Sequence, residues 1–159
     1  MKKIVLLCLV LLCAALLAGC EESETSRQTA AGKNQANEII KCFNNHDSAA
    51  LNRMFCKELT VKYGYSEIIE SAMKMYSGKC LSHKQLIVNG NYTSDGNVVK
   101  DSHINYTITD VKTDGGAVYN ITVYSYLTYE ENPNRVGITY LKIVNKETGA
   151  SVEIGKILE

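Results

Sequence analysis

Residues 98–130, with the sequence VVKDSHINYTITDVKTDGGAVYNITVYSYLTYE, decide the fold of this 159-residue chain. On both sides of the turn Asp114-Gly115-Gly116, β-branched and aromatic side chains alternate with polar ones. This period of two residues is typical of strands that pack one face on a core, and a glycine-rich turn favours an antiparallel connection. The stretch therefore predicts a hairpin made of residues 98–112 and 117–130.

The same pattern continues on both sides of this hairpin. Another alternating segment ends at the turn Ser94-Asp95-Gly96-Asn97, and a loop with the only proline, Pro133, follows the hairpin. Turns of this composition separate short strands. The sequence therefore predicts about five antiparallel strands, at residues 84–93, 98–112, 117–130, 135–146 and 150–158.

The segment before the sheet has a helical period. Apolar side chains recur every three to four positions in residues 34–45, which predicts an amphipathic helix. Asp47 has the place of an N-cap for a second helix at residues 48–59, and Ser66 has that place for a third helix, which Gly78 ends. Three helices grouped before the strands predict an α+β fold, with one helix layer on one face of the sheet.

The first twenty residues have the anatomy of a signal peptide. Lys2 and Lys3 precede an apolar stretch at residues 4–16, and small residues follow it in Leu17-Ala18-Gly19-Cys20. The apolar stretch is shorter than the roughly 20 residues that a membrane-spanning helix needs. The final tetrapeptide resembles the bacterial lipobox, which implies cleavage after residue 19, a diacylglyceryl group on Cys20 and often a further acyl chain such as palmitate on its amino group. An uncleaved anchor and an ordinary secretory signal are the alternatives.

Residues 20–33 are expected to form a flexible tether after the lipid. Residues 21–33, EESETSRQTAAGK, contain almost no large apolar side chain and therefore offer little surface to bury. Thirteen flexible residues span on the order of 20 Å. We therefore expect a signal peptide at residues 1–19, a lipidated tether at residues 20–33 and one folded domain at residues 34–159.

The order of helices and strands resembles the NTF2-like family, and in particular a set of small bacterial lipoproteins within it. The resemblance covers about residues 34–159 and is carried by HDSAALNRMF at residues 46–55 and GITYLKI at residues 137–143. It implies a strongly curved sheet that wraps around the helices into a cone with an internal cavity. A cystatin-like arrangement, with one helix across an antiparallel sheet, is the nearest alternative.

The charge composition argues against a nucleic-acid partner. The chain has 17 basic and 17 acidic side chains, and the basic ones are scattered singly, whereas a nucleic-acid partner requires a concentrated basic face. The chain has six cysteines, of which the predicted cleavage removes two. Besides Cys20 this leaves Cys42, Cys56 and Cys80, so three free thiols or one disulfide and one thiol both fit. Their spacing does not match that of a zinc site, and we expect no metal or cofactor.

The resemblance implies candidates for acid and base chemistry. NTF2-like enzymes place a few Asp, His or Tyr side chains inside the cone, and the corresponding residue types here are His46, Asp47 and His103, the last of which lies two positions after Asp101. Each has an ordinary alternative. Asp47 is also predicted to cap a helix, and an isolated histidine in a β-strand is mostly a surface or core residue.

Tyrosines are the most unusual feature of the composition, since the chain has ten of them and no tryptophan. Alternation places Tyr119 and Tyr129 on the core side of their strand and Tyr124 and Tyr126 on the opposite side. The second pair is a candidate binding strip, because tyrosine offers flat apolar area and a hydroxyl group. Tyr106 and Tyr119 are candidates for lining the cavity of a cone.

Taken together, these patterns predict a non-enzymatic domain tethered to a membrane outside the cytoplasm. Its expected partner is a small apolar or peptide-like ligand, or a neighbouring protein of the cell envelope. Two alternatives stay open: an NTF2-like enzyme that performs acid and base chemistry in the cone, and a structural or assembly component of an envelope complex.

Overall fold

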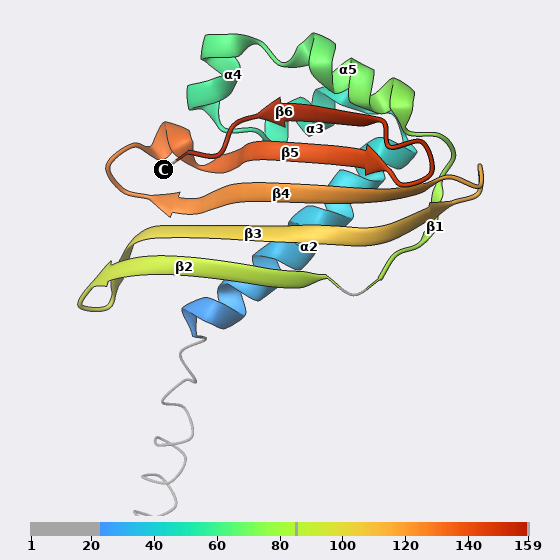
Figure 1. The fold of residues 1–159 in the computed structure, drawn as a ribbon. Helices are drawn as coiled ribbons and strands as arrows, with labels where there is room; N and C mark the ends of the chain where they lie inside the picture. Colours follow the sequence, from blue (N-terminus) through green and yellow to red (C-terminus); the bar gives the residue numbers. More distant parts are fainter. Residues whose placement is uncertain (1–22, 85, 159) are drawn as a thin grey trace, which may run out of the picture.

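The computed structural model describes residues 23–84 and 86–158 of the chain. In this part, four α-helices precede an open, antiparallel, six-stranded sheet (Figure 1). The prediction of an α+β fold with the helices first is therefore confirmed. The predicted signal peptide and Cys20 lie outside the described residues.

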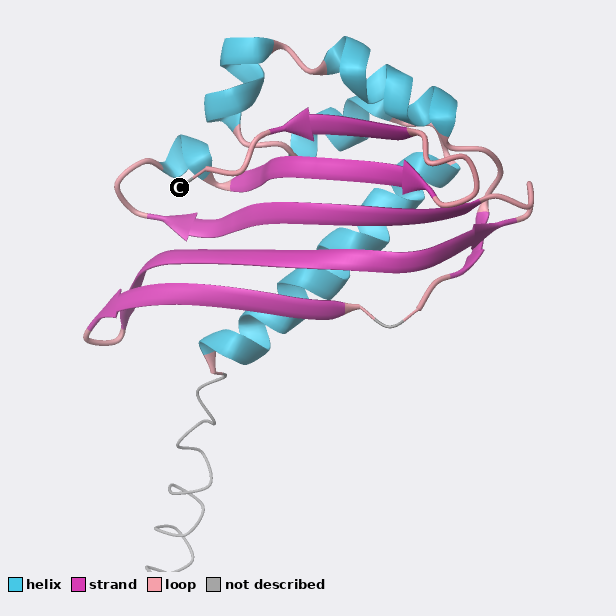
Figure 2. Cartoon of the chain, viewed as in Figure 1, coloured by secondary structure: helices cyan, strands magenta, loops and turns pink. Residues whose placement is uncertain are grey.

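The elements follow one another in a simple order, and Figure 2 separates the helices from the strands by colour. The helices are α2 (Glu24–Asn44), α3 (Ser48–Met54), α4 (Lys57–Tyr63) and α5 (Ser66–Met75). The strands are β1 (Cys80–Ser82), β2 (Ile87–Asp95), β3 (Val98–Thr113), β4 (Val118–Tyr129), β5 (Gly137–Asn145) and β6 (Ser151–Gly155). A 3-10 turn, η1 (Pro133–Arg135), joins β4 to β5.

The predicted hairpin of β3 and β4 forms the centre of the sheet. The strand order is β1-β3-β4-β5-β6, and β2 also pairs with β3. Strand β2 lies along the first part of β3, whereas the short β1 lies beside Lys112 and Thr113 at its end. Because β4 occupies the other side of β3, strands β1 and β2 share one edge of the sheet.

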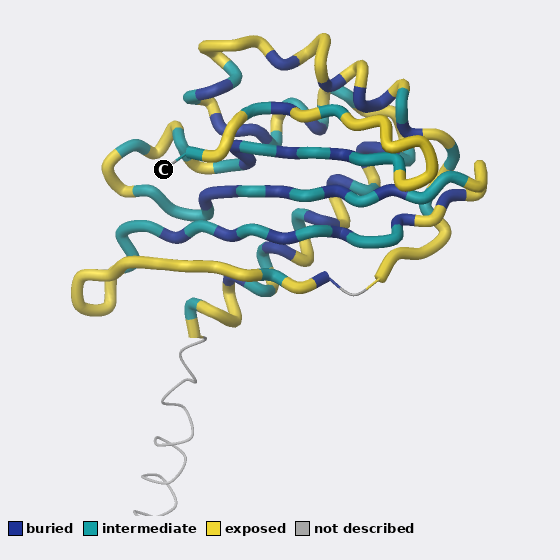
Figure 3. Tube along the Cα trace, in the orientation of Figure 1, coloured by how far each residue is buried: buried dark blue, intermediate teal, exposed yellow. Residues whose placement is uncertain are grey.

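The hydrophobic core lies between the helices and one face of the sheet. Helix α2 crosses behind the sheet, and the face toward the viewer carries none of the described α-helices (Figures 1 and 2). Buried and less buried positions alternate along β3 and β4 (Figure 3). Large side chains that are fully buried in this core include Ile39, Phe43, Ile104, Ile121 and Leu141.

The predicted helix at residues 48–59 is wrong, because the structure divides it into α3 and α4. Phe55 and Cys56 between them have extended backbones. Phe55 forms a parallel bridge with Ile138, and the Cys56 N–H donates to the Ile138 carbonyl at 2.9 Å. Strand β6 pairs with β5 only from Tyr140 onward, so Phe55 and Cys56 continue this edge of the sheet where β6 has ended. A backbone partner distant in sequence therefore outweighs the local helical pattern.

The predicted flexible tether is wrong for residues 24–33, because α2 begins at Glu24 rather than near Asn34. Ser23 caps the helix by accepting a hydrogen bond from the Ser26 N–H. This first half of α2 contacts the sheet through a buried amide and a glycine rather than through large apolar side chains. Gln28 is only 3% exposed, and Gly32 lies so close to Val88 of β2 that a Cβ atom there would clash with it.

Candidate functional site

The helix-free face of the sheet is hollowed along β3 and β4. A groove of about 330 Å³ runs over these strands and the adjacent part of β2. The β3–β4 register places Asn105 opposite Tyr124, and Thr107 opposite Thr122. The two threonine hydroxyl groups lie 3.0 Å apart. Amide, hydroxyl and aromatic groups therefore form the floor of one shallow groove.

A second, smaller hollow adjoins this groove. It has a volume of about 110 Å³, and Asn105 and Tyr124 line both hollows. Its remaining wall comes from β3, β4, β5 and the segment after β6, with His103, Tyr126, Ile157 and Leu158 among its residues. The tyrosine strip that the sequence predicts therefore lies at a concave surface.

The C-terminal segment closes one side of this smaller hollow. Strand β6 ends at Gly155, which has a φ of +80° and packs against the Thr139 carbonyl so closely that a Cβ atom would clash. The next N–H, of Lys156, donates to the same carbonyl at 2.8 Å. The Tyr126 hydroxyl then donates to the Leu158 carbonyl at 3.2 Å, which holds the segment across the sheet.

An aromatic cluster surrounds Tyr126. Its ring centroid lies 5.4 Å from the His103 ring and 5.4 Å from the Tyr129 ring. The Arg135 guanidinium lies over the Tyr129 ring at 4.6 Å, a cation–π distance, and its Nε donates to Glu58 of α4 at 3.2 Å. Burial raises the pKa of the Tyr126 hydroxyl, so this group stays protonated at neutral pH.

Tyr129 belongs to this cluster because of a β-bulge, and the prediction that it shares a side with Tyr119 is wrong. Ser102 pairs with Thr128 and His103 pairs with Tyr126, so Leu127 is an extra residue in β4. One extra residue reverses the faces of the positions that follow it. Alternation alone could not reveal this, since the sequence around Leu127 contains no glycine or proline.

The chain was compared with known families and with curated proteins. The model of a domain of unknown function, DUF5104, matches residues 38–146. The chain belongs to the DUF5104 family. No curated protein matches it. The matched region of this DUF5104 protein runs from the second half of α2 to the end of β5, and it includes the groove floor on β3 and β4. The first half of α2 and the segment around Leu158 lie outside it.

Two predicted ligand-binding tyrosines of the DUF5104 domain lie inside its core. Tyr106 is among the residues that border the larger groove, but it is only 2% exposed and its hydroxyl donates to Gln35 of α2 at 2.9 Å. Tyr119 is fully buried, donates to the Met75 carbonyl at 2.9 Å and accepts from the Ser77 N–H at 2.9 Å. Because both hydroxyl groups are used within the protein, the candidate site rests on Tyr124 and Tyr126.

The three catalytic candidates of the DUF5104 domain are not brought together. Asp47 is exposed and accepts a hydrogen bond from the Ala50 N–H at 2.8 Å, which confirms it as the N-cap of α3. His46 beside it is exposed in the turn after α2. His103 lies on the opposite side of the sheet, where its Nδ1 is 3.5 Å from an Asp101 carboxylate oxygen. No group of three metal-ligating side chains occurs within residues 23–84 and 86–158.

The three cysteines within the described residues are free thiols with low expected reactivity. Cys42 and Cys56 are buried and Cys80 is half-buried, and burial raises the pKa of all three thiols. Only the thiolate reacts with alkylating reagents. At pH 8 we expect iodoacetamide to label Cys80 slowly, and Cys42 and Cys56 only in denaturant, as measured by peptide mass spectrometry. Equally fast labelling of Cys42 with and without denaturant would contradict this packing.

Proposed function

We propose that this DUF5104 protein is a lipid-anchored, extracytoplasmic binding domain. On this proposal, the helix-free face of its sheet holds a small ligand or a peptide-like segment of an envelope protein. The observation that carries the proposal is the pair of adjoining hollows, which share Asn105 and Tyr124 and lie beside the aromatic cluster of Tyr126.

The chemistry of this face suits binding better than it suits proton transfer. Sites for small molecules are typically concave, a few hundred cubic ångströms in volume, and combine aromatic surface with a few polar groups. Tyr124 supplies a ring, while Asn105 and Thr107 supply an amide and a hydroxyl group. The floor consists of paired strands, so these groups are held in place before a ligand arrives and binding requires little ordering.

Other features support the lipid anchor and the relationship to the NTF2-like family. The tetrapeptide that ends at Cys20 supports lipidation, and two acyl chains would hold the domain stably on a membrane. Within the described residues, no helix is both long and apolar enough to cross a bilayer. The order of helices before a meandering sheet supports an NTF2-like relationship, which we include in the proposal.

An enzyme is the second candidate, and one observation favours it. His103 is the only predicted catalytic residue that lines a described hollow, and its partner Asp101 could orient the ring. His103→Gln separates the two functions. If the protein is an enzyme, the wild type should convert its bound compound and the variant should not. If it is a binding domain, the wild type and the variant should both release the compound unchanged.

The binding function is tested by native mass spectrometry of the acylated protein purified from its own host. We expect a reproducible mass adduct on the wild type that is lost in Tyr124→Ala. The matched control is Tyr63→Ala, because Tyr63 is an exposed tyrosine on α4 that lines neither hollow, and its variant should keep the adduct. A wild type without any adduct, or an adduct that survives in Tyr124→Ala, would contradict the proposed surface.

The anchor is tested separately by Cys20→Ser. This change should abolish acyl labelling and release the protein from the membrane fraction, because no thiol remains to accept the diacylglyceryl group. Acylation that persists in the variant would show that Cys20 is not the attachment point.

A further inference from the structure

The β2 edge of the sheet has an unusual composition for an exposed strand edge. Strand β2 pairs with β3, and no other strand within the described residues covers its second edge. Exposed edges are usually protected by charged side chains or proline, since they otherwise pair with other chains. Residues 87–94 contain neither, and the only charged residue of β2 is Asp95 at its end. Their side chains are mostly Asn, Thr, Ser and Tyr, which form hydrogen bonds without carrying charge.

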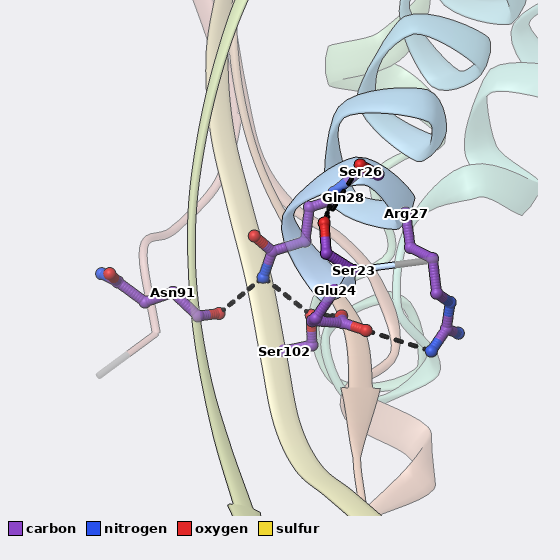
Figure 4. Close-up of polar contacts among 7 residues, drawn as sticks. All are labelled: Ser23, Glu24, Ser26, Arg27, Gln28, Asn91 and Ser102. Atoms are coloured by element: carbon purple, nitrogen blue, oxygen red, sulfur yellow. Dashed lines mark hydrogen bonds and ion pairs between the residues drawn. The ribbon is translucent and has the colours of Figure 1, made fainter. Parts of the chain in front are cut away.

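The start of α2 is fixed to this edge by a buried polar network (Figure 4). The Gln28 amide donates to the Asn91 carbonyl of β2 and to the Ser102 hydroxyl of β3, each at 3.0 Å. The Ser102 hydroxyl donates in turn to the Glu24 carboxylate at 2.6 Å. The first turn of α2 and the β2–β3 hairpin therefore keep one relative position.

The hairpin exposes large side chains, and one of them, Tyr92, lies beside this helix start. Tyr92 is 48% exposed and Val98 is 57% exposed. A groove of about 480 Å³ is lined both by Ser23 and Glu24 at the start of α2 and by residues of the hairpin, Tyr92 among them. The β2–β3 register places Tyr92 on the face of the hairpin toward the helix start, whereas Val98 lies on the opposite face, beside the turn. Glu24 and Arg27 also border this groove, and they form an ion pair with each other.

The distance to the anchor determines what lies against this surface. Three residue steps separate Cys20 from Ser23, so their Cα atoms are at most about 11 Å apart. Each polar layer of a bilayer is roughly 5–8 Å thick. A lipid on Cys20 would therefore place the start of α2, and the hairpin attached to it, within the headgroup layer or a few ångströms outside it.

We propose that the β2–β3 hairpin rests on the bilayer, with Tyr92 in the interfacial layer. The inference depends on the lipid anchor of the proposed function. Uncharged hydrogen-bonding side chains and tyrosine suit this layer, where aromatic residues with a polar end are enriched in membrane proteins. Because the charged neighbours of Tyr92, Glu24 and Arg27, pair with each other, neither anionic lipid nor salt should alter the contact much.

This orientation is compatible with the proposed binding face. The hollows lie on the helix-free face of the sheet, whereas the membrane contact lies on its β2 edge and on the hairpin tip (Figure 1). A ligand would therefore reach the hollows from the side of the domain, parallel to the bilayer surface, and not through the edge that faces the membrane.

Tryptophan fluorescence tests the contact, because the chain contains no tryptophan of its own. The acylated Tyr92→Trp protein is reconstituted into phosphatidylcholine vesicles with and without brominated acyl chains. We expect emission shifted to shorter wavelength relative to detergent, and a loss of intensity with the brominated lipid. Tyr63→Trp is the matched control, since Tyr63 is 49% exposed and lies on α4, at the opposite edge of the sheet (Figure 1). It should show neither effect.

Three outcomes would overturn the inference, and they are distinguishable. Failure of the wild type to float with vesicles, together with an unacylated Cys20, would overturn the anchor and the inference together. Flotation with equal quenching of Tyr92→Trp and Tyr63→Trp would overturn the membrane contact alone. A blue-shifted but unquenched Tyr92→Trp, with a dimer in sedimentation, would instead assign the β2 edge to a second copy of the chain.

Discussion

Replacement of Tyr119 by alanine is expected to lower the free energy of unfolding by about 3–5 kcal/mol, the range for removing a large aromatic side chain from a core. Tyr119 is fully buried, and its ring centroid lies 4.9 Å from that of Tyr76. Its hydroxyl also joins the end of α5 to the sheet through Met75 and Ser77. A loss of this size approaches the whole stability of a small domain. Urea denaturation followed by circular dichroism measures it.

Two further variants show whether this loss of stability comes from the buried side chain of Tyr119 or follows from any change to a tyrosine of β4. Tyr119→Phe keeps the ring and removes the hydroxyl, which leaves the Met75 carbonyl and the Ser77 N–H without it and should cost about 1–3 kcal/mol. Tyr124→Ala changes a half-buried tyrosine on the opposite face of the same strand and should cost only about 0.5–1.5 kcal/mol, the value of its aromatic contact with Tyr140. Similar losses for Tyr119→Ala and Tyr124→Ala would contradict the assignment of the two faces.

Removal of residues 23–31 is expected to cost about 2–4 kcal/mol, although their sequence predicts a dispensable tether. The deletion removes the three hydrogen bonds that join Gln28, Glu24 and Ser102 to one another and to β2, at about 1 kcal/mol each. It also uncovers the part of the sheet on which the first half of α2 lies. Chains that begin at residue 23 and at residue 32, both without the anchor, are compared by urea denaturation.

A substitution at full length controls for the change of chain length. Gln28→Leu preserves the helix and the apolar stem but removes both amide hydrogen bonds, so it should account for about 1–3 kcal/mol of the loss. Arg27→Leu is the matched control, because Arg27 is exposed and pairs only with Glu24 of its own helix among the described residues. Equal stability of the two truncated chains would restore the interpretation of residues 23–31 as a tether.

Much of the candidate site followed from local pattern. Alternation along β4 placed Tyr124 on the helix-free face, and the same pattern placed Tyr126 there. The smaller hollow did not follow, because its wall includes a C-terminal segment that crosses the sheet after Gly155 and is held by Tyr126. The contribution of Tyr129 was also hidden, since the bulge at Leu127 exists only in relation to the partner strand.

The sequence by itself determined the helices before strands, the β3–β4 hairpin and the cap at Asp47, because periodicity and turn chemistry act over a few neighbouring residues. The tertiary structure alone decided the break at Phe55 and Cys56, where the Ile138 backbone supplies a partner 83 residues away from Phe55. It also decided that α2 extends back to Glu24. A polar segment without an apolar stripe becomes helical there because Gln28 and Gly32 fit the sheet, and that fit exists only when both are folded.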